Sequence, residues 1–215
     1  MQASVLLIHG LARSPISLWP MDRALTQAGF STIPLWYKSH KGGLREIAER
    51  LAVDLPAEGI VHAVGHSLGG LLALDLMARL PEARRGRIVQ LGSPNLGSPL
   101  AARAHLLKPL FGPILADLED GPGRTRGLDI CAIAGTAGPV GLGQYSGIHG
   151  PNDGVVTVKS ALAAAPRNQR TTLPVLHSFM MLDGRVIRRT ERYLKAASHA
   201  GAPTTTPRTA PQRHG

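Results

Sequence analysis

The sequence predicts an α/β fold in which a mainly parallel sheet of about six strands carries helices on both faces. Short apolar runs with β character alternate along the chain with longer segments of helical periodicity, a pattern typical of βαβ units. The runs Val5–Ile8 and Ile130–Ala134 are apolar without interruption, as strands are when helices cover both faces of a sheet. A chain of 215 residues with 43% hydrophobic residues can form one domain with a substantial core.

The strands of this sheet are predicted where short stretches combine aliphatic and β-branched residues between turn residues. In chain order they are Ser4–His9, Ser31–Leu35, Ile60–Gly65, Gly86–Leu91, Asp129–Ala134 and Thr171–Leu176. Helices are predicted between them, and the first, Pro15–Ala28, ends at a glycine, as helices often do. The second, Leu44–Leu55, carries its apolar residues on one stripe and stops at a proline. Leu68–Leu80 is almost wholly apolar and predicts a buried helix, whereas Ser178–Ala197 alternates apolar and basic residues like a surface helix.

The predicted domain spans residues 1–197 and contains two segments that break this alternation. Residues 95–127 hold a short helical run followed by Pro, Gly and charged residues, and we expect a cap-like or lid-like insertion over the sheet. Residues 135–154 are rich in glycine and predict a long loop, which in a compact domain is commonly functional. Residues 198–215 lack apolar periodicity and are expected to form a disordered tail.

The formal net charge of +10 is large for a chain of this length. Basic residues cluster within 79–87 and again within 185–195, and such clusters can make weak contact with an anionic membrane surface. The second cluster has helical spacing, so a solvated helix face is the simpler interpretation. Nucleic acid is not expected as a partner, because the aromatic residues that single-strand binders place between their cations are missing.

Signals for compartment and redox state are few. No stretch approaches the roughly 20 apolar residues that span a bilayer, and the opening residues show no charged leader and no cleavage site. The single cysteine, Cys131, lies among apolar residues and is expected to be buried in a strand rather than to act as a nucleophile. Together these features favour a cytoplasmic protein.

Residues 65–70 read GHSLGG and match the G-x-S-x-G pattern of a nucleophile elbow. The pattern follows a predicted strand and opens a predicted buried helix, which is the context that the elbow requires. Small neighbours allow the tight strand-to-helix turn that strains the backbone of the serine. Ser67 is therefore predicted to be a nucleophile at the carboxyl edge of the sheet, with an incidental serine in a glycine-rich turn as the alternative.

A serine hydroxyl needs an adjacent base, and that base needs an orienting acid. With this elbow, the acid and then the base follow the serine on loops after later strands. Asp153 follows the fifth predicted strand and His177 directly follows the sixth, so they are predicted as acid and base. The alternatives are an Asx turn at Asp153 and a structural histidine at His177. His149 precedes the acid, and His66 occupies the variable position of the elbow, from which its side chain should point away from the hydroxyl.

The tetrahedral intermediate of acyl transfer needs two backbone N–H donors for its oxyanion. One is predicted to be Leu68, directly after the nucleophile. The second should come from the loop after the first strand, where Leu11 is the preferred donor and Ala12 the next. His9 is expected to be a structural hydrogen bonder. No residues have the spacing of metal ligands, and neither a metal nor a cofactor is expected.

Taken together, these motifs resemble the small bacterial lipase and esterase branch of the α/β hydrolases. The shared features are His-Gly after the opening strand, GHSLGG at the elbow, NDGVV around the acid and a late histidine, and they cover residues 4 to about 195. The resemblance implies a minimal α/β-hydrolase domain that lacks the first two strands of larger relatives. It also implies a serine hydrolase that cleaves carboxylic esters through an acyl-enzyme on Ser67. In contrast to the secreted members of this branch, we expect neither a signal peptide nor a disulfide.

The expected partner is a small-molecule ester or a lipid with an apolar acyl group. Leu100, Leu107 and Phe111, within the predicted insertion, are expected to line the acyl pocket. An acyltransferase, a thioesterase or an amidase could use the same triad, and a non-catalytic binding protein could use the same scaffold. The sequence carries no signal for a particular oligomeric state.

Overall fold

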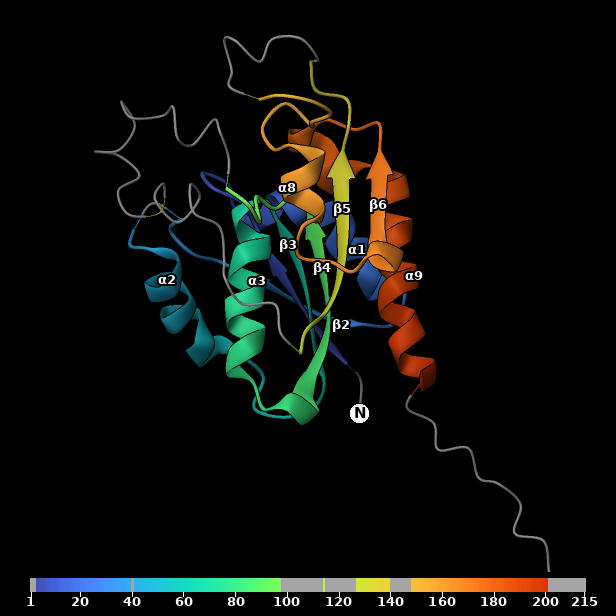
Figure 1. Cartoon of the computed structure of the whole chain (residues 1–215). Coiled ribbons are helices and arrows are strands. Elements are labelled where there is room, and N and C mark those ends of the chain that lie inside the picture. Colours follow the sequence, from blue (N-terminus) through green and yellow to red (C-terminus); the bar gives the residue numbers. More distant parts are fainter. Residues whose placement is uncertain (1–2, 40, 98–113, 115–126, 140–147, 201–215) are drawn as a thin grey trace, which may run out of the picture.

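The computed structural model describes residues 3–39, 41–97, 114, 127–139 and 148–200, and it contains a six-stranded sheet in which every strand pair is parallel (Figure 1). The strand order is β2-β1-β3-β4-β5-β6. The strands are β1 (Ser4–Ile8), β2 (Ser31–Leu35), β3 (Val61–His66), β4 (Arg85–Leu91), β5 (Asp129–Gly135) and β6 (Arg170–Leu173). The predicted α/β class and the mainly parallel sheet are confirmed.

The direction in which strands are added reverses between β1 and β3. The chain first places β2 on one side of β1 and then crosses to place β3 on the other. Ile8 at the end of β1 is in register with Gly65, so the two strands end side by side. Open α/β sheets bind ligands at such a switch point, outside the carboxyl ends of the strands. The loop after β1 and the elbow after β3 therefore lie where a site is expected.

Helices cover both faces of the sheet (Figure 1). One face carries α2 (Leu44–Leu51), α3 (Leu68–Arg79) and α8 (Val158–Leu162), and the other carries α1 (Trp19–Gln27) and α9 (Gly184–Ala200). The short 3-10 helices are η1 (Pro15–Leu18), η2 (Ala52–Asp54), η3 (Glu82–Arg84), η5 (Arg167–Gln169) and η6 (His177–Leu182). The sheet is therefore buried between two helical layers, as the uninterrupted apolar strands predict.

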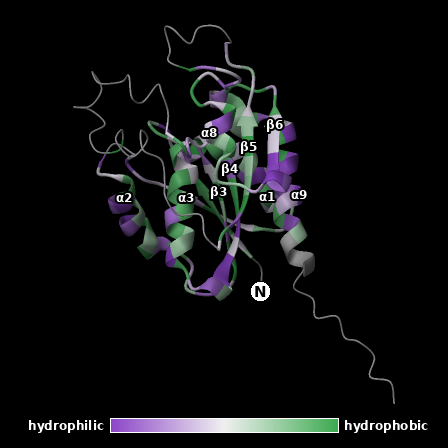
Figure 2. Cartoon of the chain, viewed as in Figure 1, coloured by the Kyte–Doolittle hydropathy of each residue, from purple (hydrophilic) through white to green (hydrophobic). Residues whose placement is uncertain are grey.

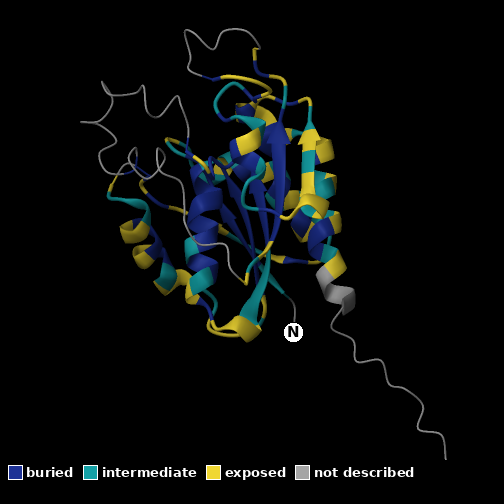
Figure 3. Cartoon of the chain, viewed as in Figure 1, coloured by how far each residue is buried: buried dark blue, intermediate teal, exposed yellow. Residues whose placement is uncertain are grey.

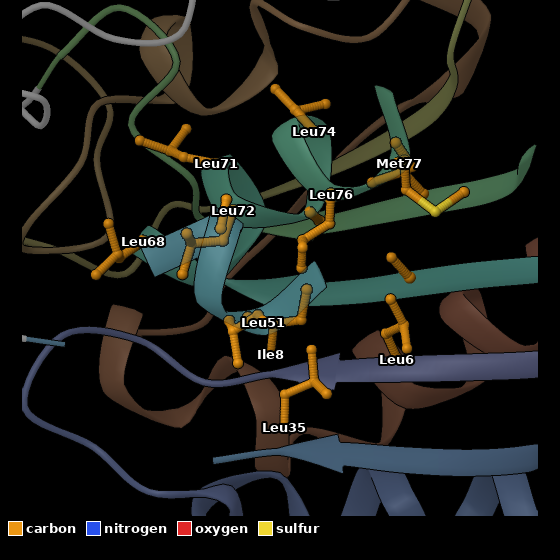
Figure 4. Packing of buried hydrophobic residues seen from close by; sticks show 14 of the residues in the cluster. Leu6, Ile8, Leu35, Leu51, Leu68, Leu71, Leu72, Leu74, Leu76 and Met77 are labelled. Carbon is orange, nitrogen blue, oxygen red and sulfur yellow. The ribbon is translucent and has the colours of Figure 1, made fainter. Parts of the chain in front are cut away.

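The core is divided by the sheet into two layers. Alternate residues of β1 point to opposite sides: Leu6 and Ile8 pack with α2 and α3, whereas Val5 and Leu7 pack with α1 and α9. Figure 4 shows Leu6 and Ile8 on the side that the leucines of α3 cover. The central strands and most of α3 are coloured as buried in Figure 3, and part of the outer helix α9 is coloured as hydrophilic in Figure 2. Cys131 is fully buried in the α1/α9 layer, as predicted, and burial raises the pKa of its thiol.

Several boundaries differ from the sequence predictions. β6 ends at Leu173 rather than at Leu176, because Pro174 has no N–H with which to continue the ladder. The helix predicted over residues 178–197 is two elements, η6 and α9, separated at Asp183. α9 then continues to Ala200, so residues 198–200 of the expected tail are helical. Residues 201–215 lie outside the described part of the chain.

Most of the predicted insertion also lies outside the described residues. Of residues 95–127, only 95–97, 114 and 127 are described, so the three pocket residues Leu100, Leu107 and Phe111 have no described position. α8 was not predicted, although Thr157 caps it by accepting a hydrogen bond from the N–H of Ser160 at 3.2 Å. Within the described ranges, no helix combines the length and the apolar character that a bilayer crossing requires.

Candidate active site

Ser67 stands at a strained turn between β3 and α3. Its backbone has φ 55° and ψ −121°, a conformation that L-residues rarely adopt. The turn is so tight that a side chain at Gly65 would collide with the backbone of Gly69, and one at Gly69 would collide with the carbonyl of Ile8. The N–H of Ser67 donates to the carbonyl oxygen of Leu91 at 2.8 Å, which holds the turn against the end of β4. The glycines of the GHSLGG segment thus have the steric role that the elbow pattern predicts.

Asp153 and His177 meet in a buried hydrogen bond. Nδ1 of His177 lies 2.7 Å from Oδ2 of Asp153, whose side chain is 1% exposed. The other carboxylate oxygen accepts the N–H groups of Val155 at 3.0 Å and Val156 at 2.7 Å. The backbone N–H of His177 also donates to the carbonyl oxygen of Asp153 at 2.9 Å. The carboxylate is therefore oriented from one side by its own loop and presents its second oxygen to the imidazole.

The loop that carries Asp153 is held by the residue before it. The side-chain amide of Asn152 donates to the carbonyl oxygens of Gly150 at 2.9 Å and Pro139 at 3.3 Å. Its Oδ1 accepts the N–H of Gly154 at 2.8 Å, which closes a turn around the acid. Asn152 is 1% exposed. Asn152 belongs to the NDGVV motif but was given no role from the sequence. The signal for its turn was an asparagine two residues before a glycine.

Gly92 lies between the turn at Ser67 and the hydrogen-bonded pair of Asp153 and His177. It directly follows β4 with φ +60°, next to the Leu91 carbonyl that binds Ser67. A side chain at this position would lie 2.9 Å from Oδ2 of Asp153 and 3.1 Å from Nδ1 of His177. The pair thus packs directly against the end of β4 that anchors the elbow. Sequence analysis missed Gly92, although a glycine directly after a predicted strand was its signal.

Ser67 and His177 reach the same edge of the sheet without a direct bond. Among the described residues, the hydroxyl of Ser67 makes no hydrogen bond. In ligand-free enzymes such nucleophile–base bonds are often long and tighten only in the substrate complex. The connections through Leu91 and Gly92 place both groups at the carboxyl ends of β3 and β4. The structure therefore brings together the three residues that the sequence singled out.

The loop after β1 has two candidate donors, and only one is left available. Ala12, with φ 53°, donates its N–H to Oγ of Ser39 at 2.9 Å. The N–H groups of Leu11 and Leu68 have no hydrogen-bond partner within the described part of the chain. Ala12, the second choice from sequence, is thus occupied, whereas the preferred Leu11 is not. Ser39 was not predicted, because it lies after β2 and no local pattern relates it to the loop after β1, 27 residues away.

His9 supports this loop from below. Its ring stacks on Tyr37 with centroids 4.2 Å apart, and its Nδ1 donates to the carbonyl oxygen of Gly10 at 2.9 Å. The hydroxyl of Tyr37 donates to the carbonyl oxygen of His9. Burial lowers the pKa of His9, so the ring is neutral at physiological pH. His9 is therefore the structural hydrogen bonder that the sequence predicted.

The ring of His66 contacts His177. The ring is 1% exposed, and its Nε2 donates to the backbone carbonyl oxygen of His177 at 3.0 Å. The two imidazole centroids are 4.8 Å apart. Burial, the nearby His177 and the charge of Arg13 hold the pKa of His66 well below its usual range. Sequence analysis assigned no role to this contact.

The basic clusters are largely engaged within the fold. Arg84 and Arg85 donate to backbone carbonyl oxygens, and Arg87 pairs with Asp129 at 2.9 Å. On α9 the exposed arginines alternate with buried apolar residues, as in the solvated helix face predicted from spacing. No group of three His, Cys, Asp or Glu side chains among the described residues could hold a metal ion.

No protein-family model matches this sequence, and no curated protein matches it either. Solved structures do match. The mature form of a lipase from Bacillus licheniformis superposes with a TM-score of 0.68 at 20% identity, over 90% of this chain and 91% of that one. A metagenomic carboxyl esterase gives 0.64 at 16% identity, over 91% and 75%. A pyrethroid hydrolase from Sphingobium faniae gives 0.61 at 15% identity, over 93% and 100%. At these identities the likeness shows a shared fold.

Proposed function

We propose that this chain, which has the α/β-hydrolase fold in its small, esterase-like form, is a serine hydrolase that cleaves carboxylic esters. The observation that carries the proposal is the buried 2.7 Å hydrogen bond between His177 and Asp153, beside the strained turn at Ser67. A serine, a histidine and a carboxylate at one edge of a parallel sheet supply the nucleophile, base and orienting acid of acyl transfer. The comparisons support the fold on which this chemistry commonly occurs.

The mechanism begins with proton transfer from Ser67. Because Nδ1 of His177 is bound to Asp153, Nε2 is the nitrogen that can accept the hydroxyl proton as Oγ attacks the ester carbonyl. The carboxylate of Asp153 stabilises the imidazolium that forms. When the tetrahedral intermediate collapses, the C–O bond to the alcohol breaks and the departing oxygen takes the proton from His177. The product is an acyl-enzyme on Ser67.

Hydrolysis of the acyl-enzyme repeats these steps with water. His177 takes a proton from the water, whose oxygen attacks the acyl carbonyl, and then returns the proton to Oγ of Ser67 as the acid leaves. In both halves, negative charge develops on the carbonyl oxygen. We assign its stabilisation to the N–H groups of Leu11 and Leu68, because both lack a partner among the described residues and the Ala12 N–H is held by Ser39.

The substrate that we propose is a small apolar ester or a lipid. η6 begins at the base itself and packs against η1 and α1, which follow the loop after β1. These neighbouring elements expose apolar side chains: Ile16 is 80% exposed, Trp19 57%, Phe179 55% and Leu182 49%. Large exposed apolar side chains on adjoining elements often mark a binding surface. Because η6 begins at His177, this apolar surface supports an apolar substrate rather than a charged one.

The test is turnover of p-nitrophenyl esters with acyl chains from short to long. Wild type should hydrolyse at least the short members, and Ser67→Ala should lose about 10³-fold or more of kcat. Ser31→Ala, at the opposite edge of the sheet, is the matched control and should retain wild-type activity. Turnover that survives in Ser67→Ala would contradict the proposal. The same series ranks acyl length, and release of p-nitrophenol that requires an added alcohol acceptor would identify a transferase instead of a hydrolase.

A further inference from the structure

We infer that His66 is a positioning residue, which fixes the base His177 to the nucleophile's own turn by donating a hydrogen bond to the His177 backbone carbonyl. The inference rests on the proposed function and assigns a role to the variable position of the elbow. Nε2 of His66 lies 3.0 Å from that carbonyl oxygen, although the two residues are 111 positions apart. The bond is buried, since His66 is 1% and His177 7% exposed.

The bond fixes the tautomer of His66. A carbonyl oxygen only accepts, so the proton of a neutral His66 must be on Nε2. Nδ1 is then an unprotonated acceptor, and it is buried without a partner within the described part of the chain. A side chain at Gly10 would lie 3.0 Å from this Nδ1 and 3.3 Å from Cβ of Ser67. His66 therefore fills the space between the loop after β1, the elbow and the base.

Neutrality of His66 also suits its position beside the base. The proposed mechanism makes His177 an imidazolium in each half-reaction, with its ring centroid 4.8 Å from that of His66. Two adjacent imidazolium rings would repel each other. Burial, the neighbouring charge of His177 and that of Arg13 keep the pKa of His66 well below its usual value, so the ring does not compete for the proton.

Within the described part of the chain, this hydrogen bond joins the residue next to the nucleophile to the base, whereas the contact at Gly92 is one of packing. Asp153 holds His177 through the imidazole and through the backbone N–H, but these bonds only tie the base to its own acid loop. Gly92, which has no side chain, only lets the pair pack closely against the end of β4. His66 is covalently adjacent to Ser67, so its bond sets where the whole acid–base pair stands relative to the nucleophile.

Two substitutions separate this role from simple space filling. Gln places its Nε2 amide the same number of bonds from Cβ as the histidine Nε2, so His66→Gln keeps a donor. His66→Met has a similar length and no donor. His62→Met is the matched control, because His62 is also buried in β3 and its Nδ1 accepts the N–H of Arg87 at 2.8 Å, far from the elbow. It should lower Tm and leave kcat unchanged.

The readouts are kcat and KM for a p-nitrophenyl ester, per active site titrated with a fluorophosphonate, and the downfield NMR signal of the proton between His177 and Asp153. We expect His66→Met to lower kcat about ten- to a hundredfold with KM within about twofold, and to shift or broaden that signal. His66→Gln should recover kcat to within about threefold and restore the signal.

Wild-type kcat in His66→Met would overturn the inference. Equal losses of kcat in His66→Met and His66→Gln would also overturn it, because the hydrogen-bond donor would then make no difference. The NMR signal distinguishes this failure from a failure of the proposed function, because it needs no substrate. If wild type hydrolysed no ester, a signal disturbed in His66→Met and retained in His66→Gln would still support positioning by His66. An undisturbed signal in His66→Met would overturn it.

Discussion

Replacement of Gly92 by alanine tests whether the acid–base pair is held against the end of β4. The new Cβ would lie 2.9 Å from Oδ2 of Asp153, 2.9 Å from Sδ of Met180 and 3.1 Å from Nδ1 of His177. Ordinary contacts begin near 3.4 Å, so the pair must move by about half an ångström. A misplacement of about 1 Å can lower a rate about a hundredfold, so we expect kcat to fall about tenfold.

The substitution also carries a backbone term that must be measured separately. Gly92 has φ +60°, and an L-residue in this region loses roughly 1 kcal/mol relative to glycine. Gly59→Ala is the control, because its φ is +79° and a Cβ there meets nothing within 4 Å. In urea denaturation Gly59→Ala should lose the backbone term alone and Gly92→Ala should lose at least as much, because it also displaces buried neighbours. Only Gly92→Ala should lose kcat toward a p-nitrophenyl ester. Wild-type kcat in Gly92→Ala, or an equal loss in Gly59→Ala, would refute the reasoning.

Asp153→Asn should keep the fold and lower kcat about 10³-fold or more in the same assay, because an amide can present a donor to the base and favour the wrong tautomer. Ser39→Ala should lower kcat about tenfold with little change in KM, since it frees the Ala12 N–H and loosens the loop that carries the oxyanion donor. Burial and the charge of Arg87 lower the pKa of His62 to about 4. As the pH falls below 6.5, His62 therefore takes up a proton in the unfolded chain before it does so in the folded protein. About 2 kcal/mol of folding stability should be lost by pH 5. His62→Asn retains an acceptor for the Arg87 N–H and should reduce this loss in denaturation curves at pH 7 and pH 5; an unchanged loss would contradict the assignment.

The elbow could be predicted from sequence because its determinants are local. The strain at Ser67 and the collision that excludes a side chain at Gly65 arise within one strand-to-helix turn, whereas a side chain at Gly69 is excluded by the neighbouring end of β1. Asp153 and His177 could be predicted because parallel strands bring the loops that follow them to one edge of the sheet. The order of the strands along the chain therefore predicts which loops bring Ser67, Asp153 and His177 to the candidate site.

The supporting contacts could not be predicted because their partners are distant in sequence. Ser39 reaches Ala12 from the loop after β2, and His66 reaches a backbone carbonyl 111 residues away. Neither contact leaves a pattern in the chain, since a serine or a histidine suits many positions. The end of β6 was missed for a different reason: the apolar run continues through Pro174, which interrupts the ladder without interrupting the hydrophobicity.

Unfavourable local features gather where the loop after β1 meets the elbow. Ser67 and Ala12 are the non-glycine residues with positive φ in the described part of the chain. Of the four buried side-chain polar atoms that lack a partner among the described residues, two, Nε2 of His9 and Nδ1 of His66, lie there; the others are Oγ of Ser93 and Oγ1 of Thr190. Each such feature lowers stability by about 1–3 kcal/mol, and natural folds retain them chiefly where function requires the conformation. This concentration identifies the same site without reference to the G-x-S-x-G pattern.

If the backbone strain at Ser67 serves to position its hydroxyl, a variant that removes the strain together with the hydroxyl should be more stable than wild type. Ser67→Gly relieves a backbone at φ 55° and ψ −121°, which is worth about 1–3 kcal/mol, against roughly 0.5–1 kcal/mol for the greater freedom of glycine in the unfolded chain. We expect a net gain of about 1 kcal/mol in urea denaturation, together with loss of ester turnover. Ser67→Ala loses the hydroxyl but keeps the strain, so it should lose turnover without this gain. A glycine variant no more stable than the alanine variant would mean that the turn at Ser67 stores no strain.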